Sequence, residues 1–463
     1  MQVENTLKDK VYIDHSEKKI YVDSNATLRD SRFLTLYKEY RGYKIIVDAS
    51  KVSENRQAVE RFSGEEEILN EISKIIHSAA ERKVSDIHIE VKDKQTTIYF
   101  REDGLLKKVY EYSAEEGERI CQALYSNATA TSHSSFAQTE YQYANIRKAS
   151  LLHPSLEGIR LQRGPMLGGQ FVVLRLLYRT STLEIIKGEN FRDTVLRTFT
   201  SYGYRKETAE IFEKVLRGAE GLMLIAGPTG SGKSTALKLS LELIHLLYPT
   251  KSIFTIEDPP EYRIAGAKQL PVPEDGKFSE VLRVAMRSDP DIIMVGEIRD
   301  PETAKVIVDA VLTGHMVLST VHAVDVYTIF ERLKKLGVDV EEIIDAGLVK
   351  VAVSQRLVPA VCPNCKEFVK FPDGIEGYVG RGCEHCGYTG VKGRVIVEEA
   401  ISQEHIKKYG LEGIREYLKE NKKDLISNAI RLVKEGKISP IHAMGYVGYF
   451  SAVEFEYTWS TTP

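Results

Sequence analysis

The part of the sequence that most restricts the fold is an apolar run that passes through a glycine-rich turn into a helix-like run. Residues 221–227 read GLMLIAG, and residues 233–248 read KSTALKLSLELIHLLY. The connection GPTGSGKS, residues 227–234, fits the pattern G-x-x-x-x-G-K-[ST]. In that context the pattern predicts a buried strand, a loop whose N–H groups point at an anion, and a helix N-terminus that favours negative charge. The alternative, a glycine-rich turn without a ligand, is disfavoured by a full match in the right context.

The glycine, lysine and serine residues of this loop carry the chemistry of phosphate binding. The glycines allow a tight backbone path, Lys233 would reach the β- and γ-phosphates, and the hydroxyl of Ser234 would bind Mg²⁺. We therefore predict that the chain binds ATP or GTP. The predicted nucleotide-binding loop comprises Gly227, Pro228, Thr229, Gly230, Ser231, Gly232, Lys233, Ser234 and Thr235.

Strand-like and helix-like runs alternate after this loop. Strand-like runs at 252–258, 291–296 and 315–322 are separated by helix-like runs at 277–288 and 302–314. Such alternation predicts parallel βαβ units with right-handed crossovers. The predicted fold class is therefore α/β, with a mostly parallel sheet around the phosphate loop.

The pattern also divides the chain into parts. Residues 1–60 hold short strand-like runs and predict a small N-terminal module, and residues 61–180 combine a helix-like run with alternating strand-like runs and predict an α+β domain. Residues 181–195 are interpreted as a linker. The α/β domain takes residues 196–463, including a four-cysteine part at 357–398 and a helical C-terminal part at 399–463.

The first acidic segment after the loop is TIEDPPEY, residues 255–262. We expect the carboxylates that act on Mg²⁺ or water to follow a strand beside the phosphate-loop strand. This segment delivers Glu257, Asp258 and Glu261 to a loop that prolines stiffen. A solvated acidic turn is the alternative.

The second acidic segment is DPDIIMVGEIRD, residues 289–300. Glu297 follows the carboxyl end of an apolar strand, where sheets of this class hold their ligands. Because Gly296 has no side chain, it cannot bind a metal, and Glu297 alone would orient or activate water. Otherwise Glu297 only caps the strand.

Two histidines flank the strand-like run TGHMVLSTVH, residues 313–322. His315 and His322 would lie about 23 Å apart at ~3.3 Å per residue, so they cannot share a metal ion. Either could sense the γ-phosphate, lie at an interface, or have a structural role.

Two pairs of arginines are further candidates. Arg283 and Arg287 have the i,i+4 spacing that places them on one helix face, either solvated or in contact with phosphate or another subunit. Arg160 and Arg175 lie in strand-like runs, where charge is less expected.

The cysteines predict a metal centre. Cys362, Cys365, Cys383 and Cys386 have the spacing C-x₂-C-x₁₇-C-x₂-C, which matches a structural four-cysteine zinc site. Four unmetallated thiols or a redox pair are the alternatives. Cys121 lies in the apolar stretch ERICQALY and is interpreted as a core residue.

Composition limits the function classes. Lys+Arg 63 against Asp+Glu 66 gives a formal net charge of -3, which argues against a dedicated nucleic-acid binder. The start of the chain has no apolar segment of the signal-peptide kind, and no run of about 18 apolar residues predicts a transmembrane helix. Any membrane role would then depend on a partner.

Together these motifs resemble the secretion and type IV pilus assembly ATPases, also called type II/IV secretory-traffic NTPases. GPTGSGKST is similar to the phosphate loop of that family, TIEDPPEY to its aspartate box, DPDIIMVGEIRD to its Walker B segment and TGHMVLSTVHA to its histidine box. Glycine before the Walker B glutamate is the norm there. The resemblance spans roughly residues 62–400 and implies a RecA-like P-loop core, a smaller PAS-like α+β domain before it, and a zinc-ribbon subdomain.

The resemblance also implies roles for individual residues. Glu297 would activate water, Glu261 would lie close to Mg²⁺ and the γ-phosphate, and His322 would lie near the nucleotide. Arg160 and Arg175 would reach the nucleotide as the preceding domain closes.

Members of the family form hexameric rings in which neighbouring subunits complete the site, and Arg283 and Arg287 match the paired arginines ahead of Walker B. The paired cysteines resemble the assembly and secretion enzymes rather than the retraction enzymes. The resemblance therefore implies a cytoplasmic homo-hexamer that uses ATP, Mg²⁺ and Zn²⁺. It would act through an inner-membrane platform protein on prepilin or pseudopilin subunits, without direct contact with nucleic acid.

The sequence departs from the family pattern at Pro260, where isoleucine or valine is usual, at residues 126–150, and beside Arg160. Two other hypotheses stay open. One is a nucleic-acid translocase or packaging motor on the same kind of core, and the other is a scaffold that binds ATP with negligible turnover.

Overall fold

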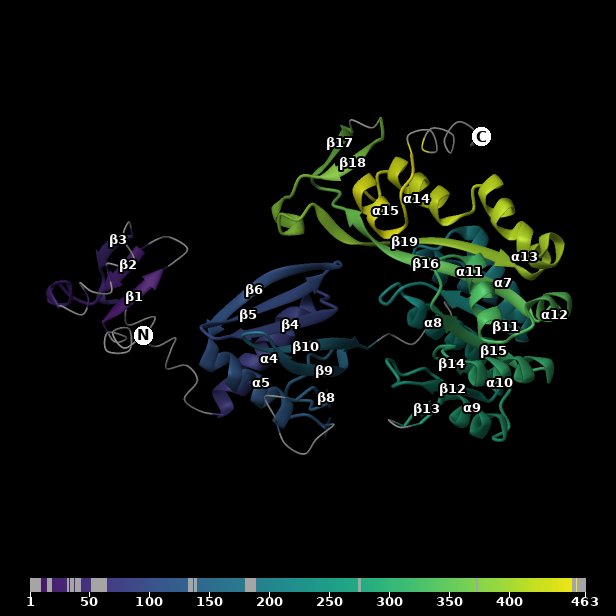
Figure 1. Cartoon of the computed structure of the whole chain (residues 1–463), viewed down its shortest axis with the longest axis horizontal. Helices are drawn as coiled ribbons and strands as arrows, with labels where there is room; N and C mark the ends of the chain where they lie inside the picture. The colour runs from purple at the N-terminus through teal and green to yellow at the C-terminus, as the bar shows by residue number, and fades with distance from the viewer. Residues whose placement is uncertain are drawn as a thin grey trace. The chain divides into compact units, whose positions relative to one another are not determined.

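The computed structural model describes residues 10–14, 19–30, 33, 37, 43–50, 65–131, 136, 140–179, 189–273, 276–371, 374–451 and 455. The chain forms two compact units (Figure 1). The first comprises Met1–Phe100 and Lys107–Leu176, and the second comprises Arg101–Leu106 and Leu177–Pro463. Of the predicted linker, residues 181–188 lie outside the described residues, and helix α6 (Phe191–Ser201) begins within the rest.

The first unit holds a small sheet formed by the strand-like runs near the start of the chain. Strands β1 (Val11–Asp14) and β2 (Lys19–Val22) pair antiparallel, and β3 (Lys44–Val47) pairs parallel with β2. Ile20, Val22 and Phe33 form its buried cluster.

The larger sheet of the first unit has seven strands in the order β6-β5-β4-β10-β9-β8-β7. Side chains alternate along β5, where Thr96, Ile98 and Phe100 are buried between more exposed neighbours, as expected for a sheet with one covered face. Helix α5 packs on β4 and on helix α4, and Cys121 on α5 is fully buried, which confirms its interpretation as a core residue. The elements are α4 (Glu65–Glu81), β4 (Asp86–Lys92), β5 (Gln95–Glu102), β6 (Leu105–Ser113), α5 (Ala114–Ser126), β7 (Ala130–Thr131), β8 (Gln142–Ile146), β9 (Leu156–Met166) and β10 (Gly169–Tyr178).

The second unit is built on a seven-stranded sheet in the order β13-β12-β14-β15-β11-β16-β19. All neighbouring pairs are parallel except β16 and β19, so the predicted mostly parallel α/β sheet is confirmed. Its strands are β11 (Gly221–Ala226), β12 (Ile253–Glu257), β13 (Ala267–Pro271), β14 (Ile292–Val295), β15 (Met316–Val321), β16 (Val349–Val361) and β19 (Val391–Ser402).

Helices cover both faces of this sheet. Leu222 and Leu224 of β11 join a cluster with helices on one face, whereas Met223 and Ile225 join a cluster with α6, α7 and α8 on the other. This split follows from the alternation of side chains along a strand. The helices are α7 (Lys206–Gly218), α8 (Lys233–Leu247), α9 (Phe278–Met286), α10 (Pro301–Leu312), α11 (Val326–Lys335), α12 (Val340–Asp345), α13 (Gln403–Glu420), α14 (Leu425–Lys434) and α15 (Pro440–Tyr446).

The sequence patterns did not indicate the long strands β16 and β19. Figure 1 shows them running from the central sheet out to the hairpin of β17 (Lys366–Lys370) and β18 (Glu376–Gly380). Residues 357–398, expected as a four-cysteine part included in the α/β domain, begin and end within two strands of the core sheet. Helices α14 and α15 pack on this pair and bury Val358, Val397 and Ile430 in a third cluster.

A buried carboxylate joins the outer strand to helix α7. The side chain of Glu398 on β19 is 2% exposed and accepts hydrogen bonds from Arg205 Nε at 2.9 Å and Nη2 at 3.0 Å. Thr208 Oγ1 donates to the same carboxylate at 3.0 Å. Burial of this charge is tolerated because the guanidinium and the hydroxyl satisfy it.

Replacement of Arg205 by alanine should therefore be costly, since it leaves the charge of Glu398 buried without its ion pair. We expect Arg205→Ala to lower the free energy of unfolding by about 3–5 kcal/mol in urea titrations. The control is Arg192→Ala, which breaks an exposed ion pair between α6 and α7 and should cost at most about 1 kcal/mol. Equal effects of the two variants would contradict the proposed importance of the buried pair.

Candidate functional site

The phosphate loop lies between β11 and α8, as its sequence predicts. Gly227, Gly230 and Gly232 have φ of 149°, 76° and 88°, a region that favours glycine. A Cβ atom added to Gly227 would lie 2.4 Å from the carbonyl oxygen of Gln355 and 2.5 Å from Ser231 Oγ. Gly227 is therefore required both by the backbone conformation and by close packing on β16.

Two residues that the motifs did not indicate hold the phosphate loop in place through hydrogen bonds. Gln355 on β16 is fully buried, and its Nε2 donates to the carbonyl oxygen of Ser231 at 2.7 Å. The hydroxyl of Tyr204 donates to Oε1 of the same glutamine, and burial raises the pKa of Tyr204 so that it stays a neutral donor. These residues belong to no short motif, because Tyr204 and Gln355 are 151 positions apart.

The lysine of the loop lies across its own backbone. Lys233 Nζ donates to the carbonyl oxygens of Gly227 at 2.8 Å and Pro228 at 2.9 Å. Burial, with a smaller contribution from Arg356, lowers the pKa of Lys233 to about 8, although the charge of Glu261 opposes that shift. The amino group of Lys233 is therefore still mostly protonated at neutral pH. The next residue, Ser234 in the first turn of α8, is exposed.

In the first acidic segment, Glu257 is engaged in holding the loop. Its carboxylate accepts hydrogen bonds from Thr255 Oγ1 at 2.7 Å and Gln269 Nε2 at 2.9 Å, and from the backbone N–H of Glu261. Burial raises its pKa above the usual range. Gln269 on β13 also donates to the carbonyl oxygen of Tyr262 at 2.8 Å, so the loop is fixed at both ends.

The ends of β12 and β14 meet at Gly296. Its N–H donates to the carbonyl oxygen of Ile256 at 2.8 Å, and an added Cβ would lie 3.3 Å from that oxygen. The next residue, Glu297, has a side chain that is 14% exposed. Glycine here brings the two acidic segments together at one edge of the sheet.

One expectation about strand order was wrong. We expected the carboxylates after a strand beside the phosphate-loop strand, but β15 lies between β11 and β14, and β12 is one strand further away. The strand that pairs with β11 on this side is β15, and the predicted site residue at its end is His322.

His322 connects the middle strand to the second acidic segment. Its Nε2 lies 3.0 Å from Glu297 Oε2. Burial, with the charges of Lys233, Arg299 and Arg332, lowers the pKa of His322, so the neutral imidazole can donate Nε2–H to the carboxylate at neutral pH. His315, in contrast, bonds through Nδ1 to the carbonyl oxygen of Ala310 at 3.0 Å, so the two histidines have separate partners.

Arg299 is a further residue that the sequence analysis did not single out. Its Nε contacts Glu297 Oε1, and its Nη1 lies 3.2 Å from Asp258 Oδ2. The guanidinium also lies 5.5 Å from the ring centroid of Phe278. The sequence signal that could have indicated Arg299 was its position inside the acidic segment DPDIIMVGEIRD.

The four predicted arginines lie on other elements of the chain. Arg283 forms an ion pair with Glu302 at 2.9 Å, and Arg287 is exposed at the C-terminal end of α9. Arg160 on β9 and Arg175 on β10 belong to the first unit, where Arg175 pairs with Asp86 at 2.9 Å. Their approach to a nucleotide stays a prediction.

A cavity of about 850 Å³ opens beside the first residues of the loop. Glu399, which lines it, accepts the backbone N–H groups of Val326 at 2.6 Å and Leu425 at 2.9 Å, the first residues of α11 and α14. Burial raises the pKa of Glu399 to about 7 despite these bonds. The carboxylate thereby ties two helices that flank the cavity.

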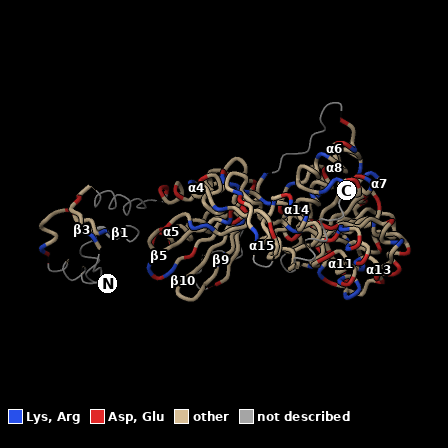
Figure 2. The backbone as a smooth tube through the Cα atoms, turned by 90° about the horizontal axis from the view of Figure 1, so that it is seen from above, with Lys and Arg blue, Asp and Glu red and all other residues tan. Residues whose placement is uncertain are grey.

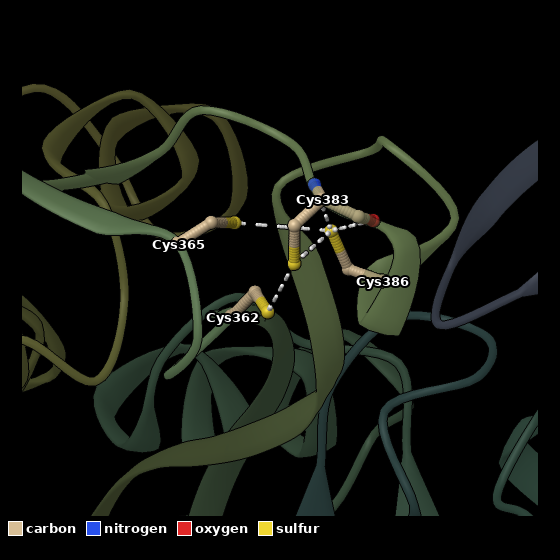
Figure 3. Close-up of side chains that lie close together, drawn as sticks. All are labelled: Cys362, Cys365, Cys383 and Cys386. Carbon is tan, nitrogen blue, oxygen red and sulfur yellow. Dashed lines mark hydrogen bonds between the residues drawn. The ribbon is translucent and has the colours of Figure 1, made fainter.

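The four paired cysteines come together at the far end of the β16–β19 pair. Figure 3 shows their sulfur atoms pointing toward one another, and all four lie within 4.8 Å. The distances from Cys383 Sγ to Cys362 Sγ and Cys386 Sγ are both 3.8 Å, and Cys365 Sγ lies 3.9 Å from Cys386 Sγ. A tetrahedral ion with metal–sulfur bonds of about 2.3 Å requires a spacing of about 3.8 Å, so the donor set fits zinc.

Backbone groups favour the thiolate form of one of the four cysteines, Cys386, whereas burial raises the pKa of Cys365 to about 12. The N–H groups of Cys383 and Gly390 each donate to Cys386 Sγ at 3.2 Å. Although burial opposes ionisation, these and neighbouring thiol hydrogen bonds lower the pKa of Cys386 to about 6.

Comparisons with known proteins identify the family of the chain. The family described as type II/IV secretion system protein matches residues 62–444. The chain belongs to this family. It is 32% identical over 375 residues to type II secretion system protein E of Pseudomonas aeruginosa, covering 78% of this chain and 70% of that protein.

Another relative is the type IV pilus assembly ATPase PilB of Thermus thermophilus, which is 36% identical over 349 residues. That match covers 71% of this chain but only 36% of the Thermus protein. Among solved structures, the ATPase DotB of Yersinia pseudotuberculosis has a TM-score of 0.56 at 20% identity, covering 83% of this chain and 94% of that one. The retraction motor PilT with bound ADP has a TM-score of 0.50 at 24% identity, covering 81% and 96%. These two likenesses concern the fold alone.

The packing of Gly227 on β16 gives a test of the loop. Gly227→Ala should raise the Kd for ATP at least about tenfold, because the new Cβ collides with the backbone of Gln355 and displaces the loop. Binding can be measured by titration with a fluorescent ATP analogue. Gly337→Ala is the control, since that glycine has φ of 82° but no atom within 4 Å of an added Cβ. Unchanged ATP affinity in Gly227→Ala would contradict this account of the loop.

Proposed function

We propose that the chain is the ATP-driven motor of a type IV pilus or type II secretion machine. Membership of the family supports its being an ATP hydrolase. The observation that carries the proposal is the meeting of three elements at the carboxyl edge of one sheet: the phosphate loop, the Glu297–His322 pair at 3.0 Å, and the proline-stiffened acidic loop.

In this proposal the chain supplies positioning and charge. The N–H groups of the loop and the ammonium of Lys233 hold the β- and γ-phosphates. Ser234 and Glu261 would hold Mg²⁺, which would supply positive charge against the phosphates. Glu297 orients the attacking water, and the neutral imidazole of His322 holds one carboxylate oxygen in place. Glu257 and Asp258 shape the acidic loop around these groups.

Assembly completes the proposed motor. Arg160 and Arg175 of the first unit, which we take to be PAS-like, would contact nucleotide as the two units close, and Arg283 and Arg287 would lie at a subunit interface of a homo-hexamer. ATP turnover would then move an inner-membrane platform protein that adds prepilin or pseudopilin subunits. Among the helices that the structure describes, none is long and apolar enough to cross a membrane. We propose that the motor acts from the cytoplasm through that partner.

The nucleic-acid translocase is the runner-up, and no feature of the site favours it. The formal net charge is -3, and Figure 2 shows Lys and Arg positions interspersed with Asp and Glu positions along both units. Binding to single strands usually requires a basic groove with aromatic platforms. Strong, salt-sensitive stimulation of turnover by DNA would select this alternative.

The assignment of Glu297 can be tested directly. Glu297→Gln keeps the shape of the side chain but removes the charge that orients water, so kcat should fall about 100-fold or more while ATP binding stays close to wild type. Lys233→Ala should instead lose ATP binding, because its charge contacts phosphate in both ground and transition states. Turnover by phosphate release and binding by titration distinguish the two. Undiminished turnover in Glu297→Gln would reject the assignment, and binding without turnover by the assembled wild type would select the scaffold hypothesis.

The cysteine centre, which we propose binds zinc in a structural role, has its own test. The purified chain should contain about one zinc per chain, and a chelator should lower its unfolding temperature. Cys386→Ser should lose most of the zinc, whereas Cys121→Ala, in the core of the first unit, should keep it. Absence of zinc together with disulfides in thiol titration would favour a redox pair instead.

A further inference from the structure

One arginine spans the two acidic segments of the site. Arg299 contacts the Oε1 atom of Glu297 through Nε and the Oδ2 atom of Asp258 through Nη1, the latter at 3.2 Å. Its guanidinium also lies against the ring of Phe278 on α9. Three elements of the second unit therefore fix the plane of this one side chain.

The contacts on Glu297 come from two sides. His322 Nε2 reaches Oε2 at 3.0 Å, while Arg299 Nε reaches Oε1. A carboxylate has about four acceptor positions, so two remain for water. The arrangement therefore orients the carboxylate without preventing it from accepting a proton.

Arginine suits this position better than lysine. Its planar fork can bind two carboxylates with different nitrogen atoms at once and can stack on an aromatic ring. An ammonium group would keep the positive charge but would not hold Glu297 and Asp258 in a fixed relation.

The contribution of Arg299 to stability should be small. Its side chain is 55% exposed, and that of Asp258 is 43% exposed. Exposed ion pairs contribute little to stability because water screens them and because forming the pair costs side-chain conformational freedom. We therefore expect the contacts of Arg299 to affect the rate of turnover more than the free energy of unfolding.

We propose that Arg299 is a positioning residue for hydrolysis that fixes the carboxylate of Glu297 against the acidic loop after β12. This inference rests on the proposed role of Glu297. A carboxylate displaced by about 1 Å loses much of its effect on the attacking water, which is the reason such a support matters.

The pH dependence of turnover should report this role. The charged and titratable groups around the pair are Lys233 on α8, Asp258 after β12, His322 after β15 and Arg332 on α11. Arg299 favours the ionised form of an adjacent carboxylate, and it also lowers the pKa of His322. Without Arg299, His322 would take up a proton more readily as pH falls, because one of the charges that lower its pKa is gone. Loss of turnover on the acid side should therefore begin at higher pH.

The test uses the full chain with Arg299→Met and Arg299→Lys, with kcat and KM measured from about pH 5.5 to 9. We expect Arg299→Met to lower kcat at pH 8 at least about tenfold, with KM within about threefold and the acid limb at higher pH. Arg299→Lys should return the acid limb toward wild type but recover kcat only in part. Arg192→Met, which removes an exposed ion-paired arginine between α6 and α7, should leave all three quantities unchanged.

The outcomes separate this inference from the proposed function. If Glu297→Gln is inactive while Arg299→Met keeps the wild-type kcat and acid limb, the positioning role is overturned and the motor proposal stands. If Glu297→Gln retains turnover, the proposed role of Glu297 in orienting water is rejected, and the positioning role of Arg299 is rejected with it. Should Arg299→Met unfold, Arg299→Lys decides: full wild-type kcat in that variant also overturns the proposal, since lysine cannot make both contacts.

Discussion

The contact between the phosphate loop and β16 governs the geometry of the site. Gly227 packs on the carbonyl group of Gln355 so closely that an added Cβ would lie 2.4 Å away, and the Gln355 side chain holds the loop at Ser231. On the same strand, Ser354 Oγ and Arg356 Nη2 donate to the carbonyl oxygen of Val324. Val324 follows His322 closely in the chain. The buried strand β16 therefore fixes both the phosphate loop and the segment after His322. The positions of these two segments depend on contacts with β16 as well as on their own local sequences.

Positive charge accumulates around this contact. Burial lowers the pKa of both Lys233 and Arg356, and the charge of Arg356 lowers that of Lys233 further. The charges of Lys233 and Arg299 in turn lower the pKa of His322. Such crowding costs stability, and a bound polyphosphate would offset it by supplying negative charge. A ligand that binds the folded state also stabilises it by mass action. The same cations that recognise phosphate should therefore make the folded second unit more stable when nucleotide is present.

Local patterns in the sequence were sufficient to predict part of this site. The loop, the two acidic segments and the paired cysteines each lie within a few residues and have spacings that the chemistry requires. Gln355 and Tyr204 were missed because a buried neutral side chain has no motif, and its partner lies far along the chain. The position of β15 between β11 and β14 was missed because strand order depends on long-range pairing. β16 and β19 were missed for a related reason. Each strand runs from the central sheet to the cysteine centre, so its two ends pack against different parts of the second unit and no single pattern of burial runs along it. The roles of Arg160 and Arg175 stay predictions, because they depend on closure of the two units.

The glycine at position 296 follows from the same geometry. Its N–H bonds to the carbonyl oxygen of Ile256 at 2.8 Å, and an added Cβ would lie 3.3 Å from that atom, a tighter approach than most side chains make. An aspartate here would require the backbone at Ile256 to shift by a few tenths of an ångström, and the adjacent strand ends carry Asp258 and Glu297. Their present separation allows one guanidinium to contact both carboxylates. The absence of an acid before Glu297 is therefore compatible with hydrolysis, because the glycine brings a second acidic loop close enough to take part.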